Sequence, residues 1–209
     1  MMIRRGLICL AALGLVGCGG VVGANPHPAS VMPEMIAGQL VPHEIMAGDN
    51  NTMAHSEQNW VEIAGGRYST DFDKGMKNRN ENLRIACGVI DGVVLQVGET
   101  FSFNEHIGLA TKEKGYLPAK IFINGKETEG LGGGICQLSS TLYNAAELSG
   151  MTIVERHPHS RRVYYVPKGR DAATAYGGVD LKFRNDLKHP VRIKAVAENG
   201  KNSVWFERL

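Results

Sequence analysis

The sequence predicts an α+β fold in which two main helices pack on a mostly antiparallel sheet. Segments with helical spacing of apolar residues precede Gly150, whereas segments with alternating or β-branched residues follow it. The turn sequences Asn124-Gly125 and Asn199-Gly200 indicate antiparallel hairpins, because Asn-Gly readily adopts the positive φ angles of a two-residue turn. Helices first and antiparallel strands later are typical of the α+β class.

The two main helices are predicted from stripes of apolar residues. The first covers residues 78–90 and the second covers residues 136–148, after which Gly150 ends the helix. The residues expected to face the core are Leu83, Ala86 and Ile90 in the first helix, and Leu138, Leu142, Ala145 and Leu148 in the second. The second helix therefore starts at Cys136.

Strands are predicted where apolar residues alternate or β-branched residues cluster. The segments are 100–103, 121–123, 152–155, 163–166, 179–183, 191–197 and a last strand that contains Val204 and Phe206. The two Asn-Gly turns follow the segments 121–123 and 191–197, so each of these two is expected to form one arm of a hairpin.

Residues 1–17 are typical of a secretory signal. Arg4 and Arg5 precede an apolar run that is too short to span a bilayer. The sequence Leu15-Val16-Gly17-Cys18 is similar to a bacterial lipobox, in which cleavage leaves Cys18 as a lipid-modified first residue. We therefore expect export and lipid anchoring on the outer face of a bacterial membrane. An ordinary signal peptide and an uncleaved hydrophobic anchor are the alternatives.

Residues 18–66 are predicted to form a tether, and residues 67–209 a single domain. Prolines interrupt the tether, its apolar residues have no sustained period, and it contains no Lys or Arg. Its His and Met residues are of the kind that bind soft metals, but their spacing is irregular, so we interpret the segment as a linker. The remaining chain is long enough to bury a core of ordinary size.

The charge of the expected domain favours an anionic partner. The whole chain of 209 residues carries a net charge of +2, whereas residues 67–209 contain 21 basic and 16 acidic residues. This excess is compatible with an anionic cell-wall polymer. No nucleic-acid-binding motif is present, so we expect no nucleic-acid partner. We also expect no cofactor.

Cys136 is the strongest candidate for a reactive residue. Three glycines precede it and allow tight backbone geometry and close approach of a substrate. The N-terminal end of a helix favours a thiolate over a thiol. Backbone N–H groups near Gly133 and Gly134, together with the side chain of Gln137, are candidate donors to an oxyanion. The alternative is a glycine-rich turn that leads to an unreactive buried cysteine.

Two histidines are candidates for the base that activates the thiol. His157 and His159 flank Pro158, which favours an extended path in which both point the same way. We expect His159 to take the proton from Cys136 and return it to a leaving amine. His157 could orient His159, bind a substrate carboxylate or be structural, and His106 is a weaker candidate.

Acidic and basic residues nearby could complete the site. Asp171 is a candidate to orient the histidine as the third member of a triad, and Asp180 competes for that role. Arg156 and Arg170 are candidates to bind a substrate carboxylate through two hydrogen bonds.

A zinc site and a disulfide are two alternative roles for the cysteines. Cys136, His157 and His159 could supply three zinc ligands, but their spacing matches no common zinc motif, so we predict no metal site. A disulfide between Cys87 and Cys136 would suit an exported protein. Cys87, however, lies in a helical apolar pattern, where cysteine usually serves as a small buried residue.

Several ordered motifs make residues 68–193 similar to the VanW domain family. The matching stretches are Gly98 to Asn104, Gly115-Tyr116, Gly132 to Asn144, Glu155 to Ser160, Gly169 to Ala172 and Asp180 to Asn185. The family is named from glycopeptide-resistance clusters, and some members are associated with L,D-transpeptidase activity on peptidoglycan, with a cysteine at the position matched by Cys136. The resemblance implies that Cys136 forms a thioester with a donor stem peptide and passes it to an acceptor amine, giving a 3-3 cross-link.

Two other functions remain open from the sequence. One is a cysteine amidase or carboxypeptidase on stem peptides, which would use the same residues with water as the acceptor. The other is a non-catalytic peptidoglycan-binding lipoprotein, in which the glycine-rich loop would hold a ligand.

Overall fold

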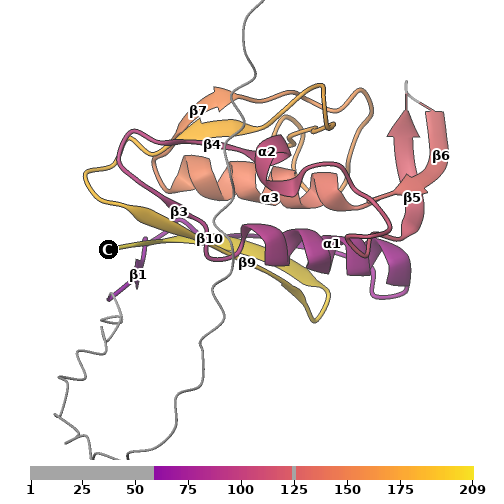
Figure 1. Ribbon diagram of the computed structural model, residues 1–209, viewed down its shortest axis with the longest axis horizontal. Helices are drawn as coiled ribbons and strands as arrows, with labels where there is room; N and C mark the ends of the chain where they lie inside the picture. Colours follow the sequence, from indigo (N-terminus) through magenta and orange to yellow (C-terminus); the bar gives the residue numbers. More distant parts are fainter. Residues whose placement is uncertain (1–58, 124–125) are drawn as a thin grey trace, which may run out of the picture. The chain divides into compact units, whose positions relative to one another are not determined.

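A computed structural model describes residues 59–123 and 126–209 (Figure 1). All of them belong to one contact unit, residues 51–209. The predicted signal peptide, Cys18, most of the predicted tether and the Asn124-Gly125 turn lie outside the described residues. In the described part, no helix has both the length and the apolar character that crossing a membrane requires.

The strands form three sheets, and every pair of strands within them is antiparallel. The largest sheet contains β1 (Val61–Glu62), β2 (Tyr68–Asp71), β10 (Lys201–Arg208), β9 (Val191–Glu198) and β3 (Val94–Leu95), and both β1 and β2 pair with β10. The second sheet has the order β4 (Thr100–Ser102), β8 (Lys182–Arg184) and β7 (Thr152–Glu155). The third is the hairpin of β5 (Pro118–Ile123) and β6 (Lys126–Leu131).

Two long helices lie between the first two sheets (Figure 1). They are α1 (Lys77–Ile90), which packs on β9, and α3 (Ile135–Leu148), which contacts β10 as well as β7. A short helix, α2 (Phe103–Ile107), follows β4 directly. The prediction of a mixed fold with antiparallel sheets is confirmed. The helices, however, have strands on two sides, because β7 and β8, which follow α3 directly, pair with β4 in a second sheet instead of extending the first.

The core is built from the apolar stripes of both helices and the inner faces of the sheets. Most predicted core residues are buried: Leu83, Ala86, Ile90, Leu138, Leu142 and Ala145. Leu148 is the exception, with 49% of its surface exposed, because it lies in the last turn of α3. Phe183 links the two sheets, since it stacks on Phe101 of β4 at 4.9 Å and meets Phe206 of β10 edge to face at 5.6 Å.

Three local predictions need correction. Residues 163–166 are an irregular loop and not a strand, and Tyr165 donates instead to the Cys136 carbonyl at 3.2 Å. The strand predicted at 179–183 is shorter and shifted, because Asp180 turns back to bond to Ser102 at 2.6 Å. The strand Val61–Glu62 precedes residue 67, where we expected the domain to begin.

The hairpin formed by β9 and β10 has the predicted turn. Asn199 and Gly200 both have positive φ angles, 53° and 85°, as a two-residue turn requires. Of the residues with positive φ in the described part, Asn199 alone is not glycine. This turn sets the register in which Val204 and Phe206 reach the core.

Candidate active site

The glycine-rich loop before α3 holds Cys136 at the edge of the core. Gly134 precedes the helix with a φ of 112°, and Cys136 is the second helical residue. The loop is packed closely on its neighbours, because a Cβ atom at Gly133 would lie 2.5 Å from the Lys120 carbonyl oxygen. Asn82 of α1 is buried and donates to the Gly133 carbonyl at 3.0 Å. The position of the cysteine is therefore fixed by packing against both α1 and β5.

The thiol of Cys136 is partly buried and faces the segment that leads to β8. Its sulfur lies 3.4 Å from the Thr174 carbonyl oxygen and 3.8 Å from the Thr174 hydroxyl. The same segment is tied to the residues after β7, since the Ala173 N–H donates to the His157 carbonyl at 2.8 Å. Two irregular segments thus meet over the start of α3.

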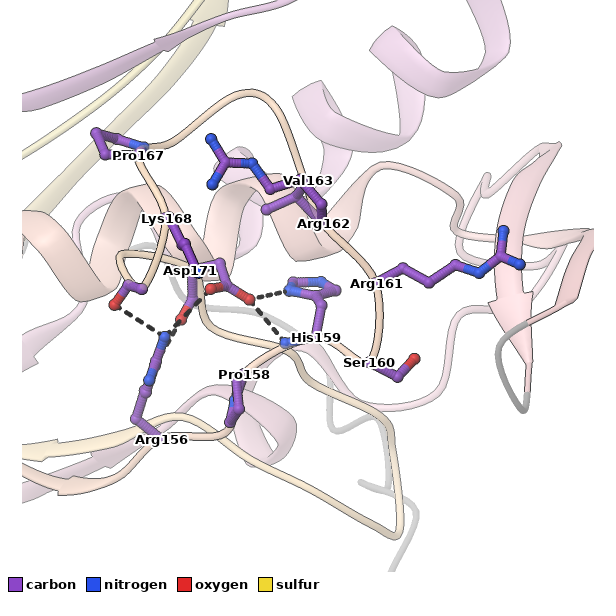
Figure 2. Close-up of a pocket in the computed structure, with 11 residues that line it drawn as sticks. Arg156, Pro158, His159, Ser160, Arg161, Arg162, Val163, Pro167, Lys168 and Asp171 are labelled. Carbon is purple, nitrogen blue, oxygen red and sulfur yellow. Dashed lines mark hydrogen bonds and ion pairs between the residues drawn. The ribbon is translucent and has the colours of Figure 1, made fainter.

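His159 and Asp171 form a close pair (Figure 2), and His159 interacts with this thiol. The Nδ1 atom of His159 lies 2.7 Å from Asp171 Oδ2, and the backbone N–H of His159 donates to the same oxygen at 2.7 Å. Only 14% and 12% of the two side chains are exposed. Because Nδ1 is occupied by Asp171, Nε2 is the ring nitrogen that remains for Cys136.

The pKa values of these three groups all shift toward the charged form. Burial raises the pKa of the Cys136 thiol, but hydrogen bonds to His159 and Thr174 and the charge of His159 lower it more. Burial lowers the pKa of His159, but its hydrogen bonds with Cys136 and Asp171 raise it above its ordinary value. Burial raises the pKa of Asp171, but bonds from His159 bring it below its ordinary value. The arrangement therefore favours a thiolate beside an imidazolium.

Arg156 and Arg170 are occupied by the protein itself. Arg156 donates to the Asp171 carbonyl at 2.6 Å, to the Gly169 carbonyl at 3.0 Å and to Asp171 Oδ1 at 3.2 Å (Figure 2). Arg170 donates to Asn144 at 2.6 Å and forms an ion pair with Glu147. The expectation that these arginines bind a substrate carboxylate needs correction: Arg156 holds Asp171 in place, and Arg170 braces α3.

Gln137 does not point toward a substrate either. Its side chain is buried, and its amide nitrogen donates to the Thr70 hydroxyl and the Asp71 carbonyl, both at 2.9 Å. The expected role as an oxyanion donor therefore does not fit this side chain. Among the described residues, the backbone N–H groups of Gly133, Gly134 and Cys136 have no hydrogen-bond acceptor, which leaves the main chain of the loop as the source of donors.

The other sequence candidates lie outside the cluster. His157 Nε2 contacts Glu155 at 3.0 Å, so the two histidines do not act together on the thiol. Asp180 bonds to Ser102 at 2.6 Å and to the backbone N–H at Asn104, where it stabilises the start of α2. His106 contacts the Ser102 carbonyl at 2.8 Å. In residues 59–123 and 126–209, no three His, Cys, Asp or Glu side chains are arranged to hold a metal ion.

The two cysteines of the described part are both free thiols, and their surroundings differ. Cys87 of α1 is 2% exposed, and its sulfur donates to Asn202 at 3.3 Å. Burial raises its pKa to about 12. Cys87 is thus a packed core residue, as the sequence predicted, and Cys136 is the thiol whose environment favours ionisation.

Two residues that no sequence motif indicated also contact the start of α3: Tyr165 bonds to Cys136, and Arg79 bonds to Gln137. The Tyr165 hydroxyl donates to the Cys136 carbonyl at 3.2 Å, and the ring meets that of His159 edge to face at 6.5 Å. Burial is the main cause that raises the pKa of Tyr165, followed by the charge of Cys136, so the hydroxyl stays protonated. The sequence feature that could have indicated the contact of Tyr165 with His159 is the pair of tyrosines, Tyr164 and Tyr165, a few residues after that histidine. For Arg79 no local signal exists.

A pocket with a volume of about 330 Å³ opens on the His159 and Asp171 side of the site (Figure 2). Its lining includes the exposed residues Arg161, Arg162 and Lys168. The pocket offers a positively charged approach to the paired His159 and Asp171.

Comparisons with known proteins place this site in a family. The model of a family described as VanW like protein matches residues 78–206. The uncharacterized protein YoaR of Bacillus subtilis (strain 168) is 42% identical over 152 residues, which is 73% of this chain and 49% of the relative. The vancomycin B-type resistance protein VanW of Enterococcus faecalis (strain ATCC 700802 / V583) is 35% identical over 125 residues, 57% of this chain and 46% of the relative.

The chain spans about half the length of each of these two relatives, at 49% and 46%. No solved structure matches. The family match covers most of the described residues, including the whole cluster of Cys136, His159 and Asp171. The chain therefore belongs to the family of VanW like proteins.

Proposed function

We propose that the chain is a cell-wall cysteine acyltransferase, an L,D-transpeptidase that forms 3-3 cross-links between peptidoglycan stem peptides. The observation that carries the proposal is the geometry of the site: His159 Nδ1 lies 2.7 Å from Asp171 Oδ2, and the interaction of His159 with Cys136, in the first turn of α3, lowers the pKa of the thiol. A thiolate next to an imidazolium supplies both a nucleophile and the acid that a leaving amine needs. The similarity to a vancomycin-resistance protein supports a substrate from the cell wall.

In the first half of the proposed reaction, the Cys136 thiolate attacks the carbonyl carbon of the third stem residue, and a carbon–sulfur bond forms. The intermediate then breaks its carbon–nitrogen bond to the terminal D-Ala. The leaving amine takes the proton from Nε2 of His159. The products are a thioester on Cys136, a neutral His159 and free D-Ala.

In the second half, the side-chain amine of an acceptor stem attacks the thioester carbonyl. Nε2 of His159 accepts the proton from this amine, the carbon–sulfur bond breaks, and the thiolate is restored beside the imidazolium. One amide bond is broken and one is made, so the exchange requires no additional energy source. Both tetrahedral intermediates carry an oxyanion, for which the free N–H groups of Gly134 and Cys136 are the proposed donors.

The location of this activity follows from the leader sequence. We propose that residues 1–17 direct export and that Cys18 carries the lipid anchor, which would hold the domain at the outer face of a bacterial membrane near peptidoglycan. Expression of the full chain with a labelled fatty acid tests this. Label should appear on the wild type and be absent from Cys18→Ala. Equal labelling of both would contradict the anchor.

Purified full chain incubated with tetrapeptide muropeptides tests the reaction. Mass spectrometry should detect 3-3 dimers that have lost the donor's terminal D-Ala, together with a stem-peptide thioester on Cys136. Cys87→Ala is the matched control, since it removes the buried cysteine and should still give dimers. Cross-linking by Cys136→Ala would overturn the proposal. Tripeptide monomers without dimers would indicate a hydrolase, and binding without turnover a non-catalytic wall protein.

A further inference from the structure

Arg79 is a partly buried arginine that has no carboxylate partner among residues 59–123 and 126–209. In the described part of the chain, three other arginines are partly buried, and each is paired with an acid: Arg156 with Asp171, Arg170 with Glu147 and Arg192 with Glu207. The one side-chain hydrogen bond of Arg79 to a described residue is to the neutral amide oxygen of Gln137, at 2.6 Å. A guanidinium has five N–H donors, so most of those on Arg79 are free.

The position of Arg79 is fixed next to the reactive cysteine. Gln137, its partner, is itself held by Thr70 and Asp71. The Arg79 side chain also packs against the glycine-rich loop, since a Cβ atom at Gly134 would lie 2.9 Å from Arg79 Cγ. Burial lowers the pKa of Arg79, and the charge of the Cys136 thiolate opposes this shift.

The neutral amide of Gln137 offsets only part of the cost of burying this charge. Removing an ion from water without an adjacent opposite charge is unfavourable. An anion bound during the reaction would supply the missing partner. The planar guanidinium is suited to a carboxylate, which it can bind through two parallel hydrogen bonds.

We propose that Arg79 binds the free C-terminal carboxylate of the donor peptide, and so selects peptides that end one residue beyond the bond that Cys136 attacks. The inference rests on the proposed function. In a terminal residue, the carboxylate carbon is only three bonds from the attacked carbonyl carbon, a span of about 4 Å. The group that recognises it must therefore lie close to the thiol, and Arg79 packs against Gly134 and donates to Gln137, on either side of Cys136 in the chain.

Donor peptides with a C-terminal carboxylate or a C-terminal amide test this proposal. We expect wild type to release D-Ala from the tetrapeptide about 10- to 100-fold more efficiently, in kcat/KM, than D-Ala amide from its amide form. Arg79→Gln should lose this preference by slowing the carboxylate substrate alone, and Arg79→Lys should retain part of it. Arg84→Gln is the matched control, because Arg84 is on the same helix but exposed and paired with Glu81. Equal slowing of both substrates by Arg79→Gln would overturn the proposal, because it would show that the arginine acts on the thiol.

A binding measurement separates this inference from the proposed reaction. Calorimetry with Cys136→Ala should give about tenfold tighter binding of the tetrapeptide than of its amide, and the double variant Cys136→Ala, Arg79→Gln should bind both equally. Equal binding of the two peptides by Cys136→Ala would refute the role of Arg79 whether or not the wild type cross-links. A preference in binding without any turnover would support Arg79 and contradict the transpeptidase.

Discussion

Replacing Asp171 by asparagine tests whether a negative charge, and not only the shape of the side chain, keeps the thiol ionised. Asp171 Oδ2 accepts two hydrogen bonds from His159, each of 2.7 Å, and the aspartate side chain is 12% exposed. A charge-assisted hydrogen bond in such a place contributes about 1.5–3 kcal/mol. Asparagine keeps an acceptor oxygen but removes this contribution, so the pKa of His159 should fall by about one to two units and that of Cys136 should rise correspondingly.

The rate of alkylation of Cys136 by iodoacetamide measures this effect directly, because only the thiolate reacts. The rate constant is followed from about pH 4 to pH 10 by mass spectrometry of the peptide that contains Cys136, in the wild type and in Asp171→Asn. We expect the midpoint of the profile to move upward by about one to two pH units, and the rate at about pH 6 to fall roughly 10- to 100-fold. Cys87, which is 2% exposed, provides a slow internal reference.

The matched control is Asp186→Asn, which makes the same change at an exposed carboxylate paired with Arg184. It should leave the profile of Cys136 unchanged. If Asp171→Asn is folded by circular dichroism and its alkylation profile coincides with that of the wild type, the charge of Asp171 does not reach the thiol through His159, and the reasoning fails.

Four further outcomes are expected. Gly134→Ala should lower the free energy of unfolding by about 1–3 kcal/mol in urea titrations, because alanine is strained at a φ of 112°; an unchanged midpoint would contradict this. Tyr165→Phe should cost about 1 kcal/mol by the same assay, since it removes the bond to the Cys136 carbonyl, and equal stability would show that the bond contributes nothing. His157→Gln should leave the rate of alkylation of Cys136 within about twofold of wild type, because the His157 ring contacts Glu155 and not the thiol; a larger change would show that His157 helps to ionise Cys136. The pKa of Asp171 is lowered on folding, so its contribution is present above about pH 4 and lost as the pH falls through the folded pKa; the stability difference between wild type and Asp171→Asn should therefore shrink from about pH 5 to about pH 3, and a constant difference would refute this linkage.

Local patterns predicted the elements that carry the site. Both long helices begin within one residue of the predicted start and end where predicted, because each has an apolar stripe with helical spacing. The hairpin turn at Asn199 and Gly200 was predicted equally well, since the positive φ angles that it needs depend only on these two residues. The structure of segment 163–166 was predicted wrongly, because the same pattern of apolar residues occurs in half-buried irregular loops and in strands.

The partners of the polar side chains depend on tertiary structure, and this is where prediction from sequence was weakest. Arg156 and Gln137 lie next to the cysteine or histidine motifs in the sequence, yet backbone carbonyls of Asp171 and Asp71, from other segments, accept their hydrogen bonds. For Arg79 the reverse holds, since it is far in sequence from the cysteine and histidine motifs but packs against the glycine-rich loop that precedes Cys136. The sequence left Asp171 and Asp180 as alternative partners of the histidine, and tertiary structure places Asp171 next to His159, whereas the catalytic roles of both remain predictions.

The spatial order of charged groups around Asp171 explains how a partly buried thiol can ionise. Arg156, Asp171, His159 and Cys136 follow one another through direct contacts or mutual electrostatic effects, with Arg156 3.2 Å and His159 2.7 Å from the carboxylate. When the proton moves from sulfur to imidazole, the four groups alternate in sign and their total charge stays zero. Proton transfer within the site therefore separates charge only between neighbours that attract each other, so burial opposes it much less than it opposes ionisation of an isolated thiol. Cys87 shows the contrast, because its thiol lies in the core without such a series of neighbouring charges, and burial raises its pKa to about 12.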